Sequence, residues 1–89
     1  MESFENLYQA ILKLETEEQV RVFFEDVCTI KEMEAMSQRL KVAELLHSGK
    51  NYQEVSSETG ASTATISRVN KCLLYGNGGY SFVLGGDKK

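Results

Sequence analysis

The side chains best suited to contact a ligand are gathered in one short stretch in the second half of this 89-residue chain. Small hydroxyl residues come first and two cations follow, and at helical spacing most of them share one face. Short Ser and Thr side chains let a helix approach base edges closely, while Arg and Lys form charge-assisted hydrogen bonds to phosphate oxygens. The pattern predicts DNA binding, and the alternative is a merely solvated face. The candidate DNA contacts are Gln53, Ser62, Thr63, Ala64, Thr65, Ser67, Arg68 and Lys71.

Residues 50–75 are expected to position these side chains as a helix-turn-helix, numbered from Tyr52 as the first of twenty positions. Ser56 is small where two crossing helices come closest, and Gly60 suits a turn that requires a positive φ. Ser62 can cap the second helix. The residues expected to lock the pair from inside are Val55, Ile66 and Val69. An αα-hairpin without a binding role is the alternative, but five matched positions favour DNA recognition.

Three further helices are predicted upstream, over about 3–14, 16–28 and 30–47. Ser3 can cap the first helix, while Thr16 and Thr29 each open a capping box. Gly49 can end the third helix in the left-handed conformation. The chain contains no proline, the commonest helix breaker, and the predicted fold class is an all-α helical bundle.

The first two predicted helices carry more apolar surface than so short a chain can readily cover. Their stripes are wide and include four aromatic residues, which a homodimer would bury. The alternative is that these side chains fill a core within their own chain, and the pattern does not decide between the two. The aromatic residues are Phe4, Tyr8, Phe23 and Phe24.

Composition and charge limit the classes of function that this chain can have. Residues 1–36 hold nine acidic and three basic residues, whereas residues 37–76 hold five basic and three acidic ones, so an anion is expected to bind in the second half. The chain has one histidine and no phosphate-binding glycine loop, so no enzyme motif is found. The cysteines at 28 and 72 do not have the spacing of metal ligands, so no metal site is expected. No apolar stretch is long enough to span a membrane, so we expect a cytoplasmic protein with reduced thiols.

A second function class stays open beside the DNA-binding one. The acidic first half could engage a basic protein, with the helix-turn-helix serving only as scaffold, which describes a helical protein-interaction adaptor without DNA binding. Binding to genomic DNA fragments at low salt would separate the two.

Two runs of residues resemble the Trp repressor family: Leu45 to Glu54, and Thr59 to Val69 with its Ala-Thr-Ile-Ser-Arg segment at residues 64–68. In length and in its ending at Leu74-Tyr75-Gly76 the chain is most similar to the short YerC/YecD-type members. The resemblance covers residues 4–76 and is strongest from Thr29 onward. It implies an intertwined all-helical homodimer that reads a palindromic DNA operator as a transcriptional regulator, most simply a repressor.

The resemblance also implies a possible effector site. With one residue fewer in the turn after Gly49, Thr29, Arg39 and Arg68 fall where the family's ligand-contacting threonine and two arginines lie. Two departures argue against a tryptophan corepressor, because Val69 replaces a glycine and Cys72 replaces the serine that contacts the amino group. Without the resemblance, Thr29 is a helix cap and Arg39 a surface residue near Glu32 or Glu44. No cofactor is expected, and the effector remains unknown.

The domain prediction is one helical domain over 1–76, with dimerisation helices over 1–48 and the helix-turn-helix over 50–75. Residues 77–89 are predicted to form a flexible glycine-rich tail after a helix stop at Gly76. Docking of its apolar cluster of Tyr80, Phe82, Val83 and Leu84, on the body, on the partner chain or across the head, is slightly favoured over a frayed terminus.

Overall fold

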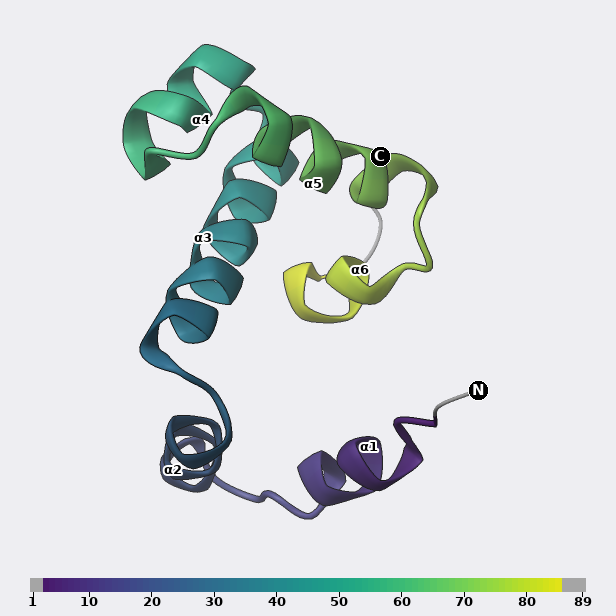
Figure 1. Ribbon diagram of the computed structural model, residues 1–89. Coiled ribbons are helices and arrows are strands. Elements are labelled where there is room, and N and C mark those ends of the chain that lie inside the picture. The colour runs from purple at the N-terminus through teal and green to yellow at the C-terminus, as the bar shows by residue number, and fades with distance from the viewer. Residues whose placement is uncertain (1–2, 86–89) are drawn as a thin grey trace. The chain divides into compact units, whose positions relative to one another are not determined.

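The computed structural model describes residues 3–85, and every regular element in that range is an α-helix (Figure 1). The all-α prediction is confirmed. The chain divides into two compact units, one up to residue 33 and one from residue 34 onward. In chain order the helices are α1 (Glu5–Leu12), α2 (Glu17–Val27), α3 (Ile30–His47), α4 (Tyr52–Thr59), α5 (Thr63–Tyr75) and α6 (Gly79–Leu84).

Helix α1 is shorter at both ends than the predicted span of 3–14. The hydroxyl of Ser3 accepts the Glu5 N–H at 3.2 Å, yet Phe4 occupies the cap position. At the other end, Lys13 and Leu14 donate to the carbonyls three residues before them, both at 3.1 Å. This tightening of the last turn ends the α-helical hydrogen bonding at Leu12.

Helix α2 begins at the predicted threonine cap, with one difference in its hydrogen bonds. The Thr16 hydroxyl accepts the Gln19 N–H at 3.1 Å, as a capping box requires. The Gln19 side chain, however, accepts from the N–H of Glu15 at 2.7 Å and not from that of Thr16. The second half of the box is therefore displaced by one residue toward the N-terminus.

Neither α1 nor α2 contains a buried residue. Phe4 and Tyr8 are each 57% exposed and Leu12 is 75% exposed, although they belong to the apolar stripe of α1. On α2 the polar face is tied together, because Arg21 bonds to both Glu18 and Glu25. The hydrogen bond to Glu18, and then the bond and charge of Glu25, raise the pKa of Arg21 above its ordinary value.

Helix α3 has the predicted bounds because strong signals mark both of its ends. The Thr29 hydroxyl accepts the Glu32 N–H at 3.1 Å, and the Glu32 carboxylate accepts the Thr29 N–H at 2.8 Å. At the other end Gly49 has φ +104, and Lys50 donates to the Leu45 carbonyl at 3.0 Å. This is the Schellman stop that glycine permits at little steric cost.

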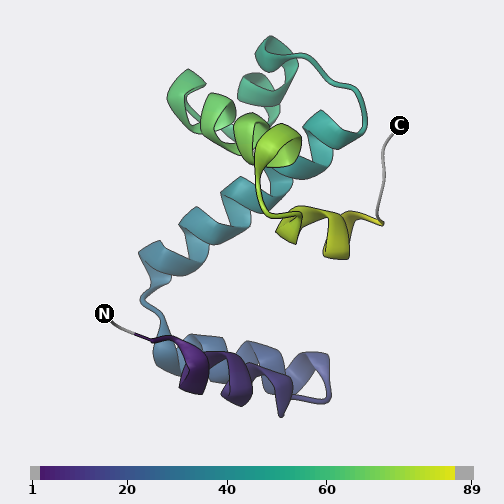
Figure 2. The ribbon, with the colours of Figure 1, turned by 90° about the vertical axis from the view of Figure 1, so that its right-hand side faces the viewer.

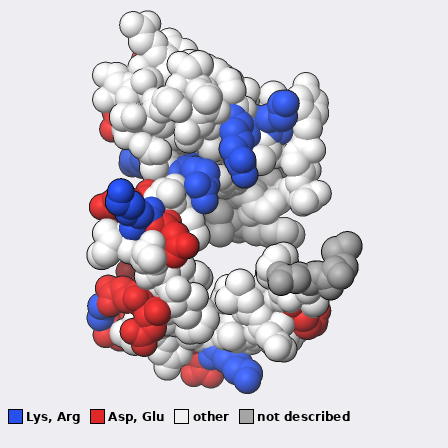
Figure 3. Space-filling model, viewed as in Figure 1, with Lys and Arg blue, Asp and Glu red and all other residues white. Residues whose placement is uncertain are grey.

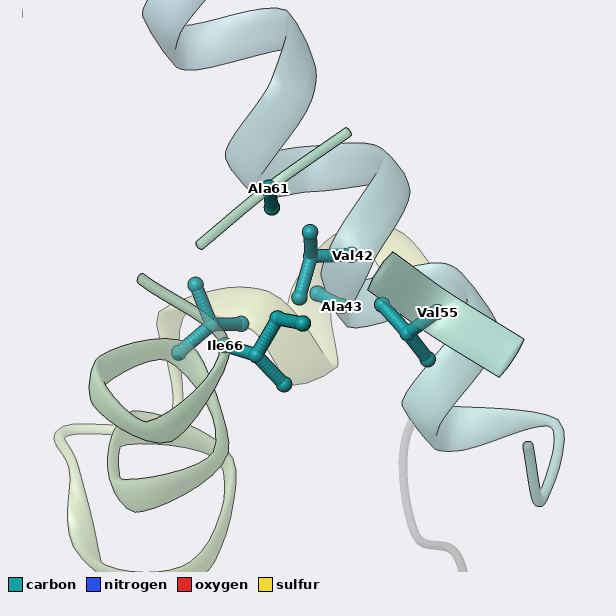
Figure 4. Packing of buried hydrophobic residues seen from close by; sticks show 6 residues of the cluster. Val42, Ala43, Val55, Ala61 and Ile66 are labelled. Atoms are coloured by element: carbon teal, nitrogen blue, oxygen red, sulfur yellow. The ribbon is translucent and has the colours of Figure 1, made fainter. Parts of the chain in front are cut away.

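The core of the second unit is small and joins α3, α4 and α5 (Figure 4). Side chains from the three helices and from the turn after α4 converge there, and burying each large one contributes about 1.5–3 kcal/mol. The buried residues are Val42, Ala43, Val55, Ala61, Ile66 and Val69.

Residues 79–84 form helix α6, so this part of the predicted flexible glycine-rich tail is helical. Gly78, with φ +85, precedes α6, and Tyr80 and Leu84 pack against the core of the second unit. Figures 1 and 2 show that the chain turns back after α5, so that α6 lies beside it. The favoured docking of the apolar cluster is thus confirmed for these two side chains, whereas Phe82 is 88% and Val83 69% exposed. The predicted tail over 86–89 lies outside the described residues.

Candidate nucleic-acid interface

Helices α4 and α5 and the turn between them form the helix-turn-helix predicted for residues 50–75. Asn51 and Glu54 make a full capping box at the start of α4, with bonds of 2.8 and 2.9 Å. Gly60 ends α4 in the left-handed region at φ +75, and Ser62 caps α5 by accepting the Thr65 N–H at 3.1 Å. Each of the two helices therefore has a defined start, and the bend between them requires glycine.

Side-chain hydrogen bonds hold the turn itself. The Thr59 hydroxyl donates to the Val55 carbonyl at 2.7 Å and lies 3.1 Å from the Ala61 nitrogen, whose N–H it accepts. The Ser56 hydroxyl donates to the Ala61 carbonyl at 3.1 Å. Ser56, the small residue predicted where the two helices come closest, thus also forms a hydrogen bond across the bend.

The buried side of α5 leaves its opposite side open. Ile66 is fully buried and Val69 is 1% exposed, so the residues between and around them face away from the core. We call the outward side the α5 face, made of Thr63, Ala64, Ser67, Arg68 and Lys71, all of which are exposed. Of the other candidates, Ser62 and Gln53 are exposed, and Thr65 is half-buried with its hydroxyl 3.2 Å from that of Ser62.

The two cations of the α5 face are not neutralised by ion pairs within residues 3–85. Lys50, in contrast, pairs with Glu58 at 3.6 Å, and Lys41 with Glu44 at 3.9 Å. Figure 3 shows Lys and Arg side chains over α5 and α3, with Asp and Glu gathered over α2 and the adjoining part of α3. Unpaired cations keep their full charge available for an anionic ligand.

The effector set suggested by the resemblance divides between the two units. Thr29 lies in the first unit, where its hydroxyl caps α3, the role predicted for it without the resemblance. Arg39 is half-buried and Arg68 exposed, and both lie in the second unit. The Glu32 carboxylate accepts the Thr29 N–H, and Glu44 pairs with Lys41.

A hollow of about 510 Å³ lies beside α5 where α6 folds back. Cys72, a free thiol on the exposed side of α5, forms part of its wall, and most of the lining is apolar. Sequence reasoning missed this hollow because it depends on the docked α6. The lining residues are Leu40, Cys72, Gly76, Asn77, Gly79, Tyr80 and Val83.

Residues 3–85 contain no cluster of three or more His, Cys, Asp or Glu side chains arranged to hold a metal ion. Among the described helices, none combines the length and the apolar character needed to cross a membrane.

Comparisons with known proteins agree on one family. The Trp repressor protein family matches residues 2–87. The protein YerC of Bacillus subtilis (strain 168), which is uncharacterised, is 49% identical over 80 residues that make up 90% of this chain and 77% of YerC. The crystal structure of a candidate Trp repressor from Staphylococcus aureus superposes with a TM-score of 0.86 at 46% identity, over 91% of this chain and 81% of that one. The crystal structure of a TrpR-like protein from Eubacterium eligens ATCC 27750 superposes with a TM-score of 0.84 at 53% identity, over 89% of this chain and 81% of that one.

Proposed function

Because this chain belongs to the Trp repressor family, we propose that it is a homodimeric, sequence-specific DNA-binding regulator of transcription, most simply a repressor. The observation that carries the proposal is the α5 face, on which Arg68 and Lys71 are exposed and pair with no carboxylate of residues 3–85, while the opposite side of the helix is buried. In this proposal residues 50–75 read DNA and residues 1–48 hold two chains together.

The α5 face supplies two kinds of contact that suit a major groove. At its N-terminal end the side chains are short, so the helix backbone can come close to base edges, and free N–H groups at the start of the helix favour phosphate oxygens. Arg68 and Lys71 lie one and two turns further along and supply cationic phosphate contacts. Gln53, exposed in the first turn of α4, is a candidate contact to the DNA backbone.

The first unit supports the dimer in this proposal. Its two helices carry apolar stripes, yet neither contains a buried residue. Surfaces of this kind are costly in water and are covered when a second chain packs on them. Two heads on such a platform would meet half-sites about one duplex turn, ~34 Å, apart.

In vitro selection of duplexes from a random pool, with and without tryptophan, tests the proposal. We expect enrichment of a palindromic sequence whose half-sites are spaced by one turn, because a two-fold dimer presents two equal heads. If no sequence is enriched even at low salt, the DNA-binding function is wrong, and the protein-interaction adaptor becomes the better interpretation.

The affinity for the selected duplex is expected to fall as the salt concentration rises, with a shallow dependence. Few cations face the DNA in each head, so the slope of log affinity against log salt should be about −4 to −6 for a dimer. Fluorescence anisotropy at salt concentrations from about 50 to about 200 mM measures this slope. A slope near zero would show that phosphates do not anchor the complex.

Tryptophan is expected not to bind tightly. Val69 is 1% exposed and packed in the core, so it fills space beside α5 that a glycine would leave open to a flat ring. The Cys72 thiol is also a poor partner for an ammonium group. Calorimetric titration of the protein with L-tryptophan should give a Kd weaker than about 1 mM, and saturation at micromolar concentrations would overturn this proposal.

A further inference from the structure

Gln38 of α3 makes a polar contact with the turn of the helix-turn-helix. Its side-chain Nε2 donates to the backbone carbonyl of Thr59 at 3.2 Å, in a partly buried position, across 21 residues of sequence. The other side-chain bonds of the turn span at most five residues. Gln38 therefore joins the bend to another part of the second unit, whereas those bonds act only within the bend.

The accepting carbonyl lies at a sensitive place. Thr59 is the last residue of α4, so its carbonyl is one of those that the helix leaves without an internal partner. Gly60 follows with φ +75, Ala61 is 3% exposed in the core, and α5 begins two residues later. A group that holds the Thr59 carbonyl thus holds the backbone immediately before the chain changes direction.

We propose that Gln38 is a positioning residue for DNA recognition, which sets the direction of α5 by tying the Thr59 carbonyl to α3. This inference rests on the proposed function. Helix α5 has 13 residues and is about 20 Å long, so a small rotation at the bend moves the α5 face by ångströms. Base-edge hydrogen bonds do not tolerate such a shift, whereas a long cation can still reach a phosphate.

The test substitutes Gln38→Met, which keeps the length and helix propensity of the side chain and removes its donor. The probes are the duplex selected by the wild-type protein and a scrambled duplex of the same composition. Affinity for the selected duplex should fall by about 3- to 10-fold, and affinity for the scrambled duplex should change by less than about 2-fold. Gln38→Lys, which still carries a donor, should keep the ratio of the two affinities near that of the wild type.

Gln9→Met is the matched control, because Gln9 is exposed on α1 and its side chain bonds, among the described residues, to Glu5 of the same helix, at 3.5 Å. It should leave both affinities unchanged. If Gln38→Met keeps the wild-type ratio, or if both affinities fall together with Tm, the positioning role is wrong and the proposed function stands. If the wild-type protein itself does not distinguish the two duplexes, the proposed function fails and the positioning role falls with it.

Discussion

Reversing both cations of the α5 face, Arg68→Glu with Lys71→Glu, is expected to abolish DNA binding and leave the helical fold intact. Both side chains are exposed and form no ion pair within the described range, so their replacement removes no folded-state contact of note. In a dimer the pair occurs twice, and four attractive phosphate contacts become repulsive. At about 100 mM salt we expect the affinity to fall by roughly 10²- to 10⁴-fold. Anisotropy with the selected duplex measures the loss, and circular dichroism checks the helix content.

The matched control is Lys13→Glu with Lys31→Glu, which changes the net charge of the chain by the same amount. Both lysines are exposed and lie in the first unit. If α5 anchors the phosphates, this control should lose much less affinity than the pair on α5, through long-range repulsion alone. Equal losses in the two variants would mean that total charge governs binding and that the α5 face has no special part in it.

The sequence predicts those features of this fold whose causes are local. Thr29 and Glu32 satisfy each other's backbone N–H groups within four residues, and Gly60 is required by a backbone angle at one position. Such signals depend little on tertiary context, which is why the bounds of α3 and the bend before α5 could be read from the residues. The exposed cations of α5 follow as well, since burial of Ile66 and Val69 fixes which side faces out.

Features that depend on packing between distant segments could not be read in this way. Helix α6 is rich in glycine at its ends and short, and it owes its place to Tyr80 and Leu84 against the core. Val42 is fully buried because α4 and α5 cover that line of α3, which the periodicity of α3 alone does not show. The bond from Gln38 to Thr59 likewise requires that α3 and the turn be brought together first.

The apolar stripe of α1 leads to the second large effect. Tyr8→Glu with Leu12→Glu is expected to convert the proposed dimer into a monomer. These side chains are 57% and 75% exposed in the single chain, one turn apart on the same face, so the substitution should leave the folded protomer soluble. In a two-fold interface four carboxylates would be buried without partners, and removing one partner of a buried ion pair already costs about 3–5 kcal/mol. We expect the dimer dissociation constant to rise at least about 10³-fold, as measured by analytical ultracentrifugation.

Asn6→Glu with Gln9→Glu adds the same two charges on the polar side of α1 and serves as the control. It should stay dimeric and keep its affinity for the selected duplex, whereas the Tyr8 and Leu12 variant should retain only the binding of a single head to a half-site. The variant should lose affinity for the full duplex because the second head is no longer held at a high local concentration once the first head is bound. A wild-type protein that sediments as a monomer at micromolar concentration would contradict the prediction, and so would a Tyr8 and Leu12 variant that remains a dimer. In the first case each head would have to bind DNA alone, and no palindrome would be enriched by selection.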